Sequence, residues 1–254
     1  MIASRSSRFA RGERARPWVL GHRGARHAAP ENTLRAFELS RSEGAHGVEL
    51  DVRIDAEGTV VVLHDPELGR VSQGACRAHA EELSTAELLR VDVGGGERVP
   101  LLEDVLRWAE QFDQCVNVEV KSDVRDRKRL VEGVTRVLAH GGDHAGRILL
   151  SSFDPRLVWA LARRLPRLGV CWLVHEKQKI LRHAPGWRAL GAVGLNPEHS
   201  LLSGHGVRRL KARGALVNTW TVNDPALAAA YARFGVDCII SDCPGKILQA
   251  LESS

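Results

Sequence analysis

Three acidic residues in this sequence alternate with apolar residues in short runs. Glu49 and Asp51 alternate with the valine and leucine residues of the run 48–54, and Glu119 lies in a second such run, 116–120. In a β-strand, alternate side chains share one face. The apolar side chains need the face on which helices pack. The three carboxylates are therefore predicted to point the other way, into the interior of a sheet or barrel.

Crowded carboxylates repel one another and lose solvation, so each must be neutralised or share a cation. A set of three carboxylates suits Mg²⁺ or Ca²⁺ better than zinc, because hard cations prefer oxygen ligands. The structural alternative is that these carboxylates form salt bridges with Arg53 and Lys121, because ion-pair networks also gather charge. The spacing of the residues leaves both interpretations open.

Two histidines and two basic residues stand at the ends of predicted strands. His22 and His64 end two different apolar runs. Because histidine titrates near neutral pH, such a pair could divide the work of a general base and a general acid. Arg23 and Lys121 suit an anionic substrate, and arginine can bind phosphate through two hydrogen bonds. The other histidines, His175 among them, lack this context and are interpreted as solvated or structural.

The elements that must position these residues alternate regularly between strands and helices. The predicted strands cover 18–20, 48–54, 59–63, 116–120, 148–150, 170–174, 193–195, 216–222 and 238–241. The predicted helices cover 31–43, 101–112, 126–140, 206–213, 226–234 and 247–251, and a further helix follows Pro155. This pattern predicts an α/β protein with a parallel sheet. Roughly eight βα units match a single-domain (β/α)8 barrel, a TIM barrel, in which catalytic groups lie where strands end. A doubly wound open sheet is the alternative.

Positive charge is concentrated at the start of the chain. Residues 1–16 hold five arginines and one glutamate, a net charge of +4, and the formal charge of the whole chain is +5. We predict a disordered basic tail over 1–16 and a barrel domain over 17–254. The nearly neutral body gives little support to nucleic-acid binding, which needs a clustered basic face.

The cysteines and the apolar runs bear on location. Five cysteines, an odd number without a Cys-x-x-Cys pair, favour reduced thiols in a cytoplasmic protein. The sequence contains no secretory signal pattern and no apolar run long enough to span a bilayer. A cytoplasmic location without stable membrane insertion is therefore expected.

A series of motifs runs in one order along the body of the chain. They are His22-Arg23-Gly24, Pro30-Glu31-Asn32-Thr33, Glu49-Leu50-Asp51-Val52, His64-Asp65, Glu119-Val120-Lys121, Ser151-Ser152-Phe153, Trp220-Thr221-Val222-Asn223 and Ser241-Asp242-Cys243-Pro244. Together they resemble the motifs of the glycerophosphodiester phosphodiesterase family, over roughly residues 18 to 250. One stretch departs from the family pattern, which often reads Arg-Thr-Thr-x-Gly: the residues here are Arg70-Val71-Ser72-Gln73-Gly74.

The resemblance implies a TIM barrel that hydrolyses glycerophosphodiesters to sn-glycerol 3-phosphate and an alcohol, usually with Mg²⁺ or Ca²⁺. The implied substrate is a small molecule. The implied site consists of the metal ligands Glu49, Asp51 and Glu119, the acid/base pair His22 and His64, the phosphate-binding residues Arg23 and Lys121, and Phe153 and Trp220 on the glycerol side.

Two alternative functions also fit the sequence. The first is a related lipid phosphodiesterase, such as a lysophospholipase D or a phospholipase C, which would need an apolar seat for an acyl chain near 67–99 or 176–190. The second is a non-catalytic barrel that binds a phosphorylated ligand. An inactivated relative would be expected to lack a histidine or a carboxylate, and none is missing here. The sequence leaves open the alcohol group, the metal, the attacking oxygen, the roles of the two histidines and the oligomeric state.

Overall fold

Eight parallel strands close into a barrel in the part of the chain that the computed structural model describes, residues 8–140, 146–178 and 185–253. The barrel strands are β1 (Trp18–His22), β2 (Gly47–Ile54), β4 (Cys115–Val120), β5 (Ile148–Ser152), β6 (Gly169–Val174), β7 (Gly194–Pro197), β8 (Leu216–Thr219) and β9 (Cys238–Ser241). Strand β1 pairs in parallel with both β2 and β9, which closes the circle. The predicted (β/α)8 TIM barrel is confirmed, and the open-sheet alternative is wrong.

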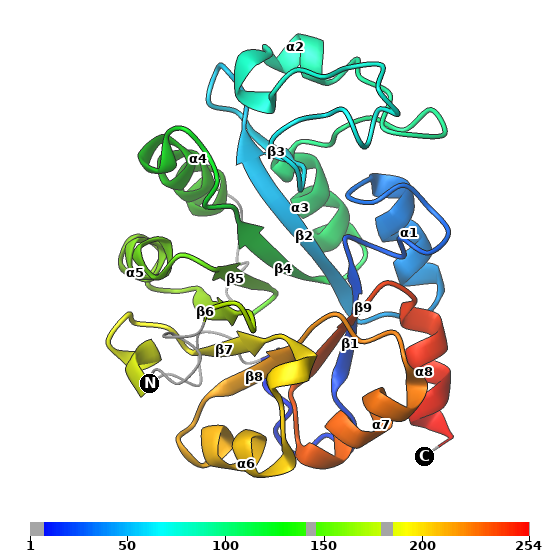
Figure 1. Cartoon of the computed structure of the whole chain (residues 1–254), viewed down its shortest axis with the longest axis vertical. Coiled ribbons are helices and arrows are strands. Elements are labelled where there is room, and N and C mark those ends of the chain that lie inside the picture. Colours follow the sequence, from blue (N-terminus) through cyan, green and yellow to red (C-terminus); the bar gives the residue numbers. More distant parts are fainter. Residues whose placement is uncertain (1–7, 141–145, 179–184, 254) are drawn as a thin grey trace.

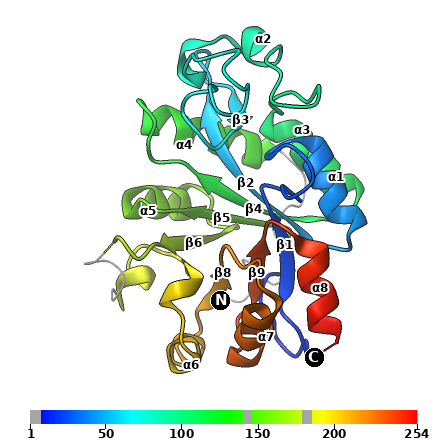
Figure 2. The same cartoon turned by 45° about the vertical axis from the view of Figure 1, so that its right-hand side comes forward.

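Helices surround the strands as an outer ring (Figures 1 and 2). They are α1 (Leu34–Ser42), α3 (Leu102–Gln111), α4 (Arg127–His140), α5 (Pro155–Arg164), α6 (Gly204–Ala212), α7 (Pro225–Phe234) and α8 (Pro244–Glu252). The shorter elements are α2 (Thr85–Leu88) and the 3₁₀ turns η1 (Ala80–Glu82), η3 (Pro185–Arg188) and η4 (His199–Leu201). A ninth strand, β3 (Val60–Val62), pairs antiparallel with the end of β2.

Strand β2 shows why the sequence folds this way. Val48, Leu50 and Val52 are fully buried in the core between the strands and the surrounding helices. Glu49 and Asp51 alternate with them and face the barrel interior, as predicted. Burial of the outward apolar side chains, at about 1.5–3 kcal/mol each, therefore forces two carboxylates inward.

Several element boundaries differ from the prediction. Helix α1 begins at Leu34 rather than at residue 31, because Asn32 has φ 58° and cannot continue a right-handed helix. The hydroxyl of Thr33 caps the helix by accepting the Ala36 N–H at 3.2 Å. Strand β8 ends at Thr219, before the predicted end at residue 222.

The N-terminal segment differs from the expected disordered tail. Residues 1–7 lie outside the described residues, but residues 8–16 pack against the barrel. Phe9 is fully buried among side chains that mostly come from the beginnings of the strands. The Arg11 backbone N–H donates to Asp237 at 2.7 Å, and the Arg14 guanidinium lies 4.4 Å from the centroid of the Trp18 ring. One apolar side chain among the arginines thus gives residues 8–16 a fixed place.

The long excursion between β3 and α3 has an apolar core of its own. Its buried side chains include Leu68, Leu88 and Val99, which pack with Val61 and Leu63. The excursion stands at the top of Figure 1, beyond the ends of β2 and β3. Among the described residues, no helix combines the length and the apolar character needed to cross a bilayer.

Candidate active site

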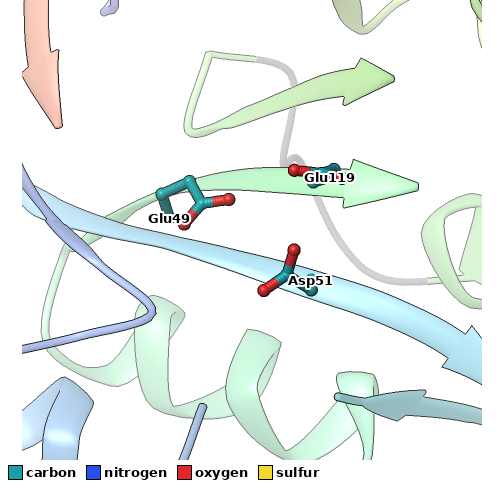
Figure 3. Close-up of side chains that lie close together, drawn as sticks. All are labelled: Glu49, Asp51 and Glu119. Atoms are coloured by element: carbon teal, nitrogen blue, oxygen red, sulfur yellow. The ribbon is translucent and has the colours of Figure 1, made fainter. Parts of the chain in front are cut away.

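Three buried carboxylates converge in the barrel interior (Figure 3). Glu49 and Asp51 project from β2 and Glu119 from β4, and the parallel register places Asp51 directly opposite Glu119. One oxygen of each residue lies within 4.8 Å of the others. Their exposed fractions are 5%, 1% and 8%. The three acidic residues predicted to share a face therefore form one cluster.

The electrostatics of this cluster fit a divalent cation. Burial raises the pKa of Glu49 well above its usual range, and the negative charges of Asp51 and Glu119 raise it further. Burial also raises the pKa of Glu119. Both shifts mean that the ionised forms are costly to hold together without more positive charge. Hard oxygen ligands within reach of one another are the donor set that Mg²⁺ or Ca²⁺ prefers.

The structural salt-bridge alternative is realised only in part. Lys121 Nζ lies 2.9 Å from Glu119 Oε1 and 3.4 Å from Asp51 Oδ1. Arg53 turns away from the cluster and pairs with Asp123 at 2.7 Å. Lys121 therefore offsets part of the negative charge, whereas Arg53 supports the loop after β4.

The Arg23 backbone and side chain are both held in place. Arg23 has φ 56°, a conformation that is uncommon for residues other than glycine and that clusters at functional sites. Its backbone N–H donates to Glu49 at 3.2 Å, Nη1 donates to Glu31 at 2.9 Å, and Nε lies 3.2 Å from Asp51 Oδ2. Burial alone would raise the pKa of Asp51, but the positive charges of Lys121 and Arg23 hold it below its usual range.

Gly24 makes the turn after β1 possible. Its φ is 83°, and a Cβ at this position would lie 2.6 Å from the Ala36 backbone. Only glycine allows α1 to pack this closely against the turn. The close packing keeps Arg23 beside the carboxylate cluster.

The two predicted acid/base histidines share one arrangement. His22 Nδ1 lies 2.7 Å from Asp242 Oδ1, and His64 Nδ1 lies 2.6 Å from Asp65 Oδ1. Both rings line the same cavity of about 220 Å³, together with Glu49. Each carboxylate holds one ring nitrogen, which leaves Nε2 as the nitrogen available to a bound molecule.

An apolar wall faces the charged one. The rings of Phe153, which follows β5, and Trp220, which follows β8, meet edge to face with centroids 5.5 Å apart. The Trp220 Nε1–H donates to the Asn196 carbonyl at 2.8 Å, which fixes the indole. Leu173 and Ile240 complete this side of the cavity. The apolar lining thus comes from the β5, β6, β8 and β9 side of the barrel, whereas His22, Glu49 and Glu119 come from β1, β2 and β4.

The structure brings together all the site residues predicted from the sequence. Eight of them line the cavity: His22, Arg23, Glu49, His64, Glu119, Lys121, Phe153 and Trp220. Asp51 is absent from the lining but contacts Arg23 and Lys121.

Sequence reasoning missed three further residues. Asn117 lines the cavity from β4, two residues before Glu119, so the alternation that identified Glu119 could have found it. His175 directly follows β6 and also lines the cavity, a position that its interpretation as solvated or structural did not anticipate. Asn32 Nδ2 donates to Asp51 Oδ2 at 3.0 Å, a contact that the spacing of these residues in the sequence does not predict.

The mouth of this (β/α)8 barrel therefore combines a candidate metal site with histidine and cationic side chains, which fits the class of enzymes that cleave phosphate esters. Comparison with known proteins gives the family. Residues 22–246 match the model of the glycerophosphoryl diester phosphodiesterase family. The chain belongs to this family, and it is an enzyme of the glycerophosphodiester phosphodiesterase type.

Individual relatives agree with this assignment. A glycerophosphodiester phosphodiesterase of Caldanaerobacter subterraneus is 28% identical over 242 residues, which covers 91% of this chain and 96% of the relative. A probable glycerophosphodiester phosphodiesterase 1 of Mycobacterium tuberculosis is 30% identical over 261 residues, 93% of each chain. The solved structure of an Oleispira antarctica phosphodiesterase in complex with the product sn-glycerol-3-phosphate matches with a TM-score of 0.83 at 27% identity, covering 93% of this chain and 97% of that one.

Proposed function

We propose that this enzyme hydrolyses glycerophosphodiesters to sn-glycerol 3-phosphate and an alcohol, with His22 and His64 as the proton-transfer pair. The observation that carries the proposal is that both ring systems line one cavity with the carboxylate cluster and with Arg23 and Lys121. The solved relative that holds sn-glycerol 3-phosphate supports the substrate class.

We infer that Glu49, Asp51 and Glu119 hold a divalent metal, Mg²⁺ or Ca²⁺. When bound, such an ion neutralises charge on the phosphodiester and stabilises the developing negative charge. The burial of the carboxylates and the raised pKa of Glu49 support this assignment. Lys121, which contacts two of the three carboxylates, would stay close enough to bind phosphate beside them.

The side chains divide the chemistry as follows. Arg23, oriented by Glu31, binds a non-bridging phosphate oxygen. One histidine removes a proton from the attacking oxygen through Nε2, and the other donates a proton to the departing alkoxide. The attacking oxygen is either the glycerol 2-hydroxyl, which gives a cyclic phosphate that water then opens, or water itself. Phe153 and Trp220 pack against the glycerol carbons and exclude water from that side.

A direct test measures release of sn-glycerol 3-phosphate from glycerophosphocholine. The variants His22→Gln and His64→Gln should each lower kcat by about 10²- to 10⁴-fold. His205→Gln is the matched control, because His205 is exposed on α6, and it should keep wild-type turnover. If both site variants stay fully active while folded, the acid/base assignment is wrong.

The metal and the substrate class need separate measurements. EDTA should abolish turnover, and added Mg²⁺ or Ca²⁺ should restore it. Full activity in EDTA would contradict the metal role. A parallel assay with lysophospholipids tests the lipid alternative, and faster turnover of the lipids than of glycerophosphodiesters would favour it.

We also propose a cytoplasmic location, because all five cysteines are free and Cys115, Cys171 and Cys238 are buried. It also remains a prediction that the protein binds no nucleic acid and does not insert stably into membranes. Equal activity in cytoplasmic and exported fractions of the source cells would contradict the proposed location.

A further inference from the structure

The His22 ring is hydrogen-bonded to Asp242, which lies 220 residues further along the chain. His22 ends β1, and Asp242 directly follows β9. These two strands pair in parallel, with Gly21 opposite Ser241. The residues that follow, His22 and Asp242, therefore lie side by side at the barrel mouth. His22 Nδ1 and Asp242 Oδ1 lie 2.7 Å apart, which is a short hydrogen-bond distance.

Asp242 is itself fixed by Asn223 from the loop after β8. Asn223 Nδ2 donates to Asp242 Oδ2 at 2.7 Å. The Asn223 side-chain carbonyl accepts both the Asp242 backbone N–H at 2.9 Å and the Ser241 hydroxyl at 3.0 Å. Because a backbone N–H can only donate, the Asn223 amide has one possible orientation, with its NH₂ group toward Asp242.

This arrangement determines which nitrogen of His22 carries the proton. A carboxylate oxygen only accepts, so it selects the tautomer with hydrogen on Nδ1. The lone pair then stands on Nε2, the ring atom 4.0 Å from Glu49 Oε2. Arg26 Nε lies 3.5 Å from the same Asp242 oxygen and offsets part of its charge.

We propose that Asp242, held by Asn223, is the positioning residue of His22. It sets the tautomer and the orientation of the ring, so that Nε2 faces the cavity ready to exchange a proton with the substrate. Asp242 is not among the residues that line the cavity, so it acts through His22, which does line it. The inference rests on the proposed function of His22.

The variant Asp242→Asn inverts this selection. The locked Asn223 donor needs an oxygen opposite it, so the new amide at position 242 presents its oxygen to Asn223 and its NH₂ group to His22. That NH₂ group favours the tautomer with hydrogen on Nε2. We expect kcat to fall by about 10²- to 10⁴-fold, with KM almost unchanged because the groups that bind the substrate stay in place.

A second exchange at position 223 should reverse the effect. In the double variant Asn223→Asp/Asp242→Asn, the new carboxylate at 223 accepts from the amide NH₂ group at 242. The amide oxygen at 242 then faces His22 and again selects hydrogen on Nδ1. We expect at least a 10-fold recovery of kcat over the single variant Asp242→Asn. A merely structural role for Asp242 predicts an additive loss instead.

Nuclear magnetic resonance of ¹⁵N-histidine-labelled enzyme with Mg²⁺ reads the tautomer directly. His22 is assigned by the signal that disappears in His22→Gln. Hydrogen on Nδ1 is expected in the wild type and in the double variant, and on Nε2 in Asp242→Asn. An unchanged tautomer in Asp242→Asn, wild-type kcat in that variant, or no recovery in the folded double variant would each overturn the proposal.

Two controls separate this proposal from the proposed function. If His22→Gln keeps wild-type turnover, the function of His22 is wrong; if it is inactive but Asp242→Asn is fully active, only the positioning role is wrong. Should Asp242→Asn fail to fold, Asn223→Ala tests the same support. It should lower kcat by about 10-fold without changing KM, and an unchanged kcat would contradict the proposal.

Discussion

Arg70 and Glu31 form a bidentate ion pair at the mouth of the barrel, with Nη2–Oε1 at 2.6 Å and Nη1–Oε2 at 3.0 Å. Arg70 comes from the excursion after β3, and its Nε also donates to Asp65 at 2.6 Å. Glu31 in turn accepts from Arg23. One arginine outside the cavity lining thus braces both the carboxylate that holds His64 and the carboxylate that holds Arg23.

The first prediction follows from this brace. Arg70→Ala should lower kcat/KM by about 10- to 100-fold, because small displacements of positioned groups are costly. The assay is release of sn-glycerol 3-phosphate at saturating metal. Arg98→Ala is the control, since Arg98 forms an exposed pair with Asp92 in the same excursion and should keep its activity. Equal losses in the two variants would contradict a specific role for Arg70.

The second prediction concerns how much repulsion among the three buried carboxylates lowers the stability of the folded protein. In EDTA at pH 8, Glu49→Gln should unfold at a higher temperature than the wild type, with about 1–4 kcal/mol more stability, because it removes one of three repelling charges. Mg²⁺ at about 100 times Kd should stabilise the wild type by about 2.7 kcal/mol and the variant by much less. Calorimetry measures both effects.

Glu103→Gln serves as the reference for this comparison, because Glu103 is exposed on α3. It should respond to EDTA and Mg²⁺ as the wild type does. If Glu49→Gln is less stable than the wild type in EDTA, charge repulsion is not the dominant feature of the cluster.

The third prediction concerns stability against pH through His46. Burial lowers the pKa of His46, and the nearby positive charge of Arg14 lowers it further. Its Nδ1 also accepts the Val19 N–H at 3.1 Å, which a proton on that nitrogen would prevent. The unfolded chain therefore binds this proton more readily. The stability contribution is fully present above about pH 6.5 and is lost as the pH falls toward the lower native pKa.

His46→Gln keeps an acceptor for Val19 but does not titrate. The slope of unfolding free energy against pH between about 7 and 5 should therefore be smaller in this variant than in the wild type. Urea titrations at several pH values measure the slope. The exposed His205→Gln should keep the wild-type slope, and an identical slope in both variants would show that His46 does not contribute.

The fourth prediction concerns the N-terminal segment. Phe9→Ala should destabilise the protein by about 3–5 kcal/mol, the usual cost of removing a fully buried phenylalanine side chain. Leu227→Ala on α7, where the leucine is 39% exposed, should cost less than about 1 kcal/mol. Urea unfolding measures both. A loss for Phe9→Ala no larger than that for Leu227→Ala would mean that residues 8–16 do not contribute to the stability of the barrel.

Much of the site could be predicted because two simple rules apply to a parallel barrel. The period of two in β2 placed Glu49 and Asp51 on one face, and the apolar alternates decided which face is inside. The rule that polar residues gather where strands end then selected His22, His64 and Lys121. Both rules use only neighbouring residues along the chain.

What the sequence could not predict depends on contacts between distant segments. Nothing near Arg53 indicates that it pairs with Asp123 rather than with the carboxylate cluster. The partner of His22 lies 220 residues away, and their contact depends on the register between β1 and β9. The burial of Phe9 could not be predicted, because the arginines around it made the segment look like a disordered tail. Local composition does not reveal the space between the strands that its ring fills.

The pairing of β1 with β9 also has a consequence for synthesis on the ribosome. The emerging chain acquires the carboxylate cluster early, since β2 and β4 are complete by Val120. Asn223 and Asp242 arrive last, after more than two hundred residues have been translated. All three acidic residues are therefore synthesised long before His22 can meet its partner, and we expect turnover to begin only after β9 has left the exit tunnel and paired with β1.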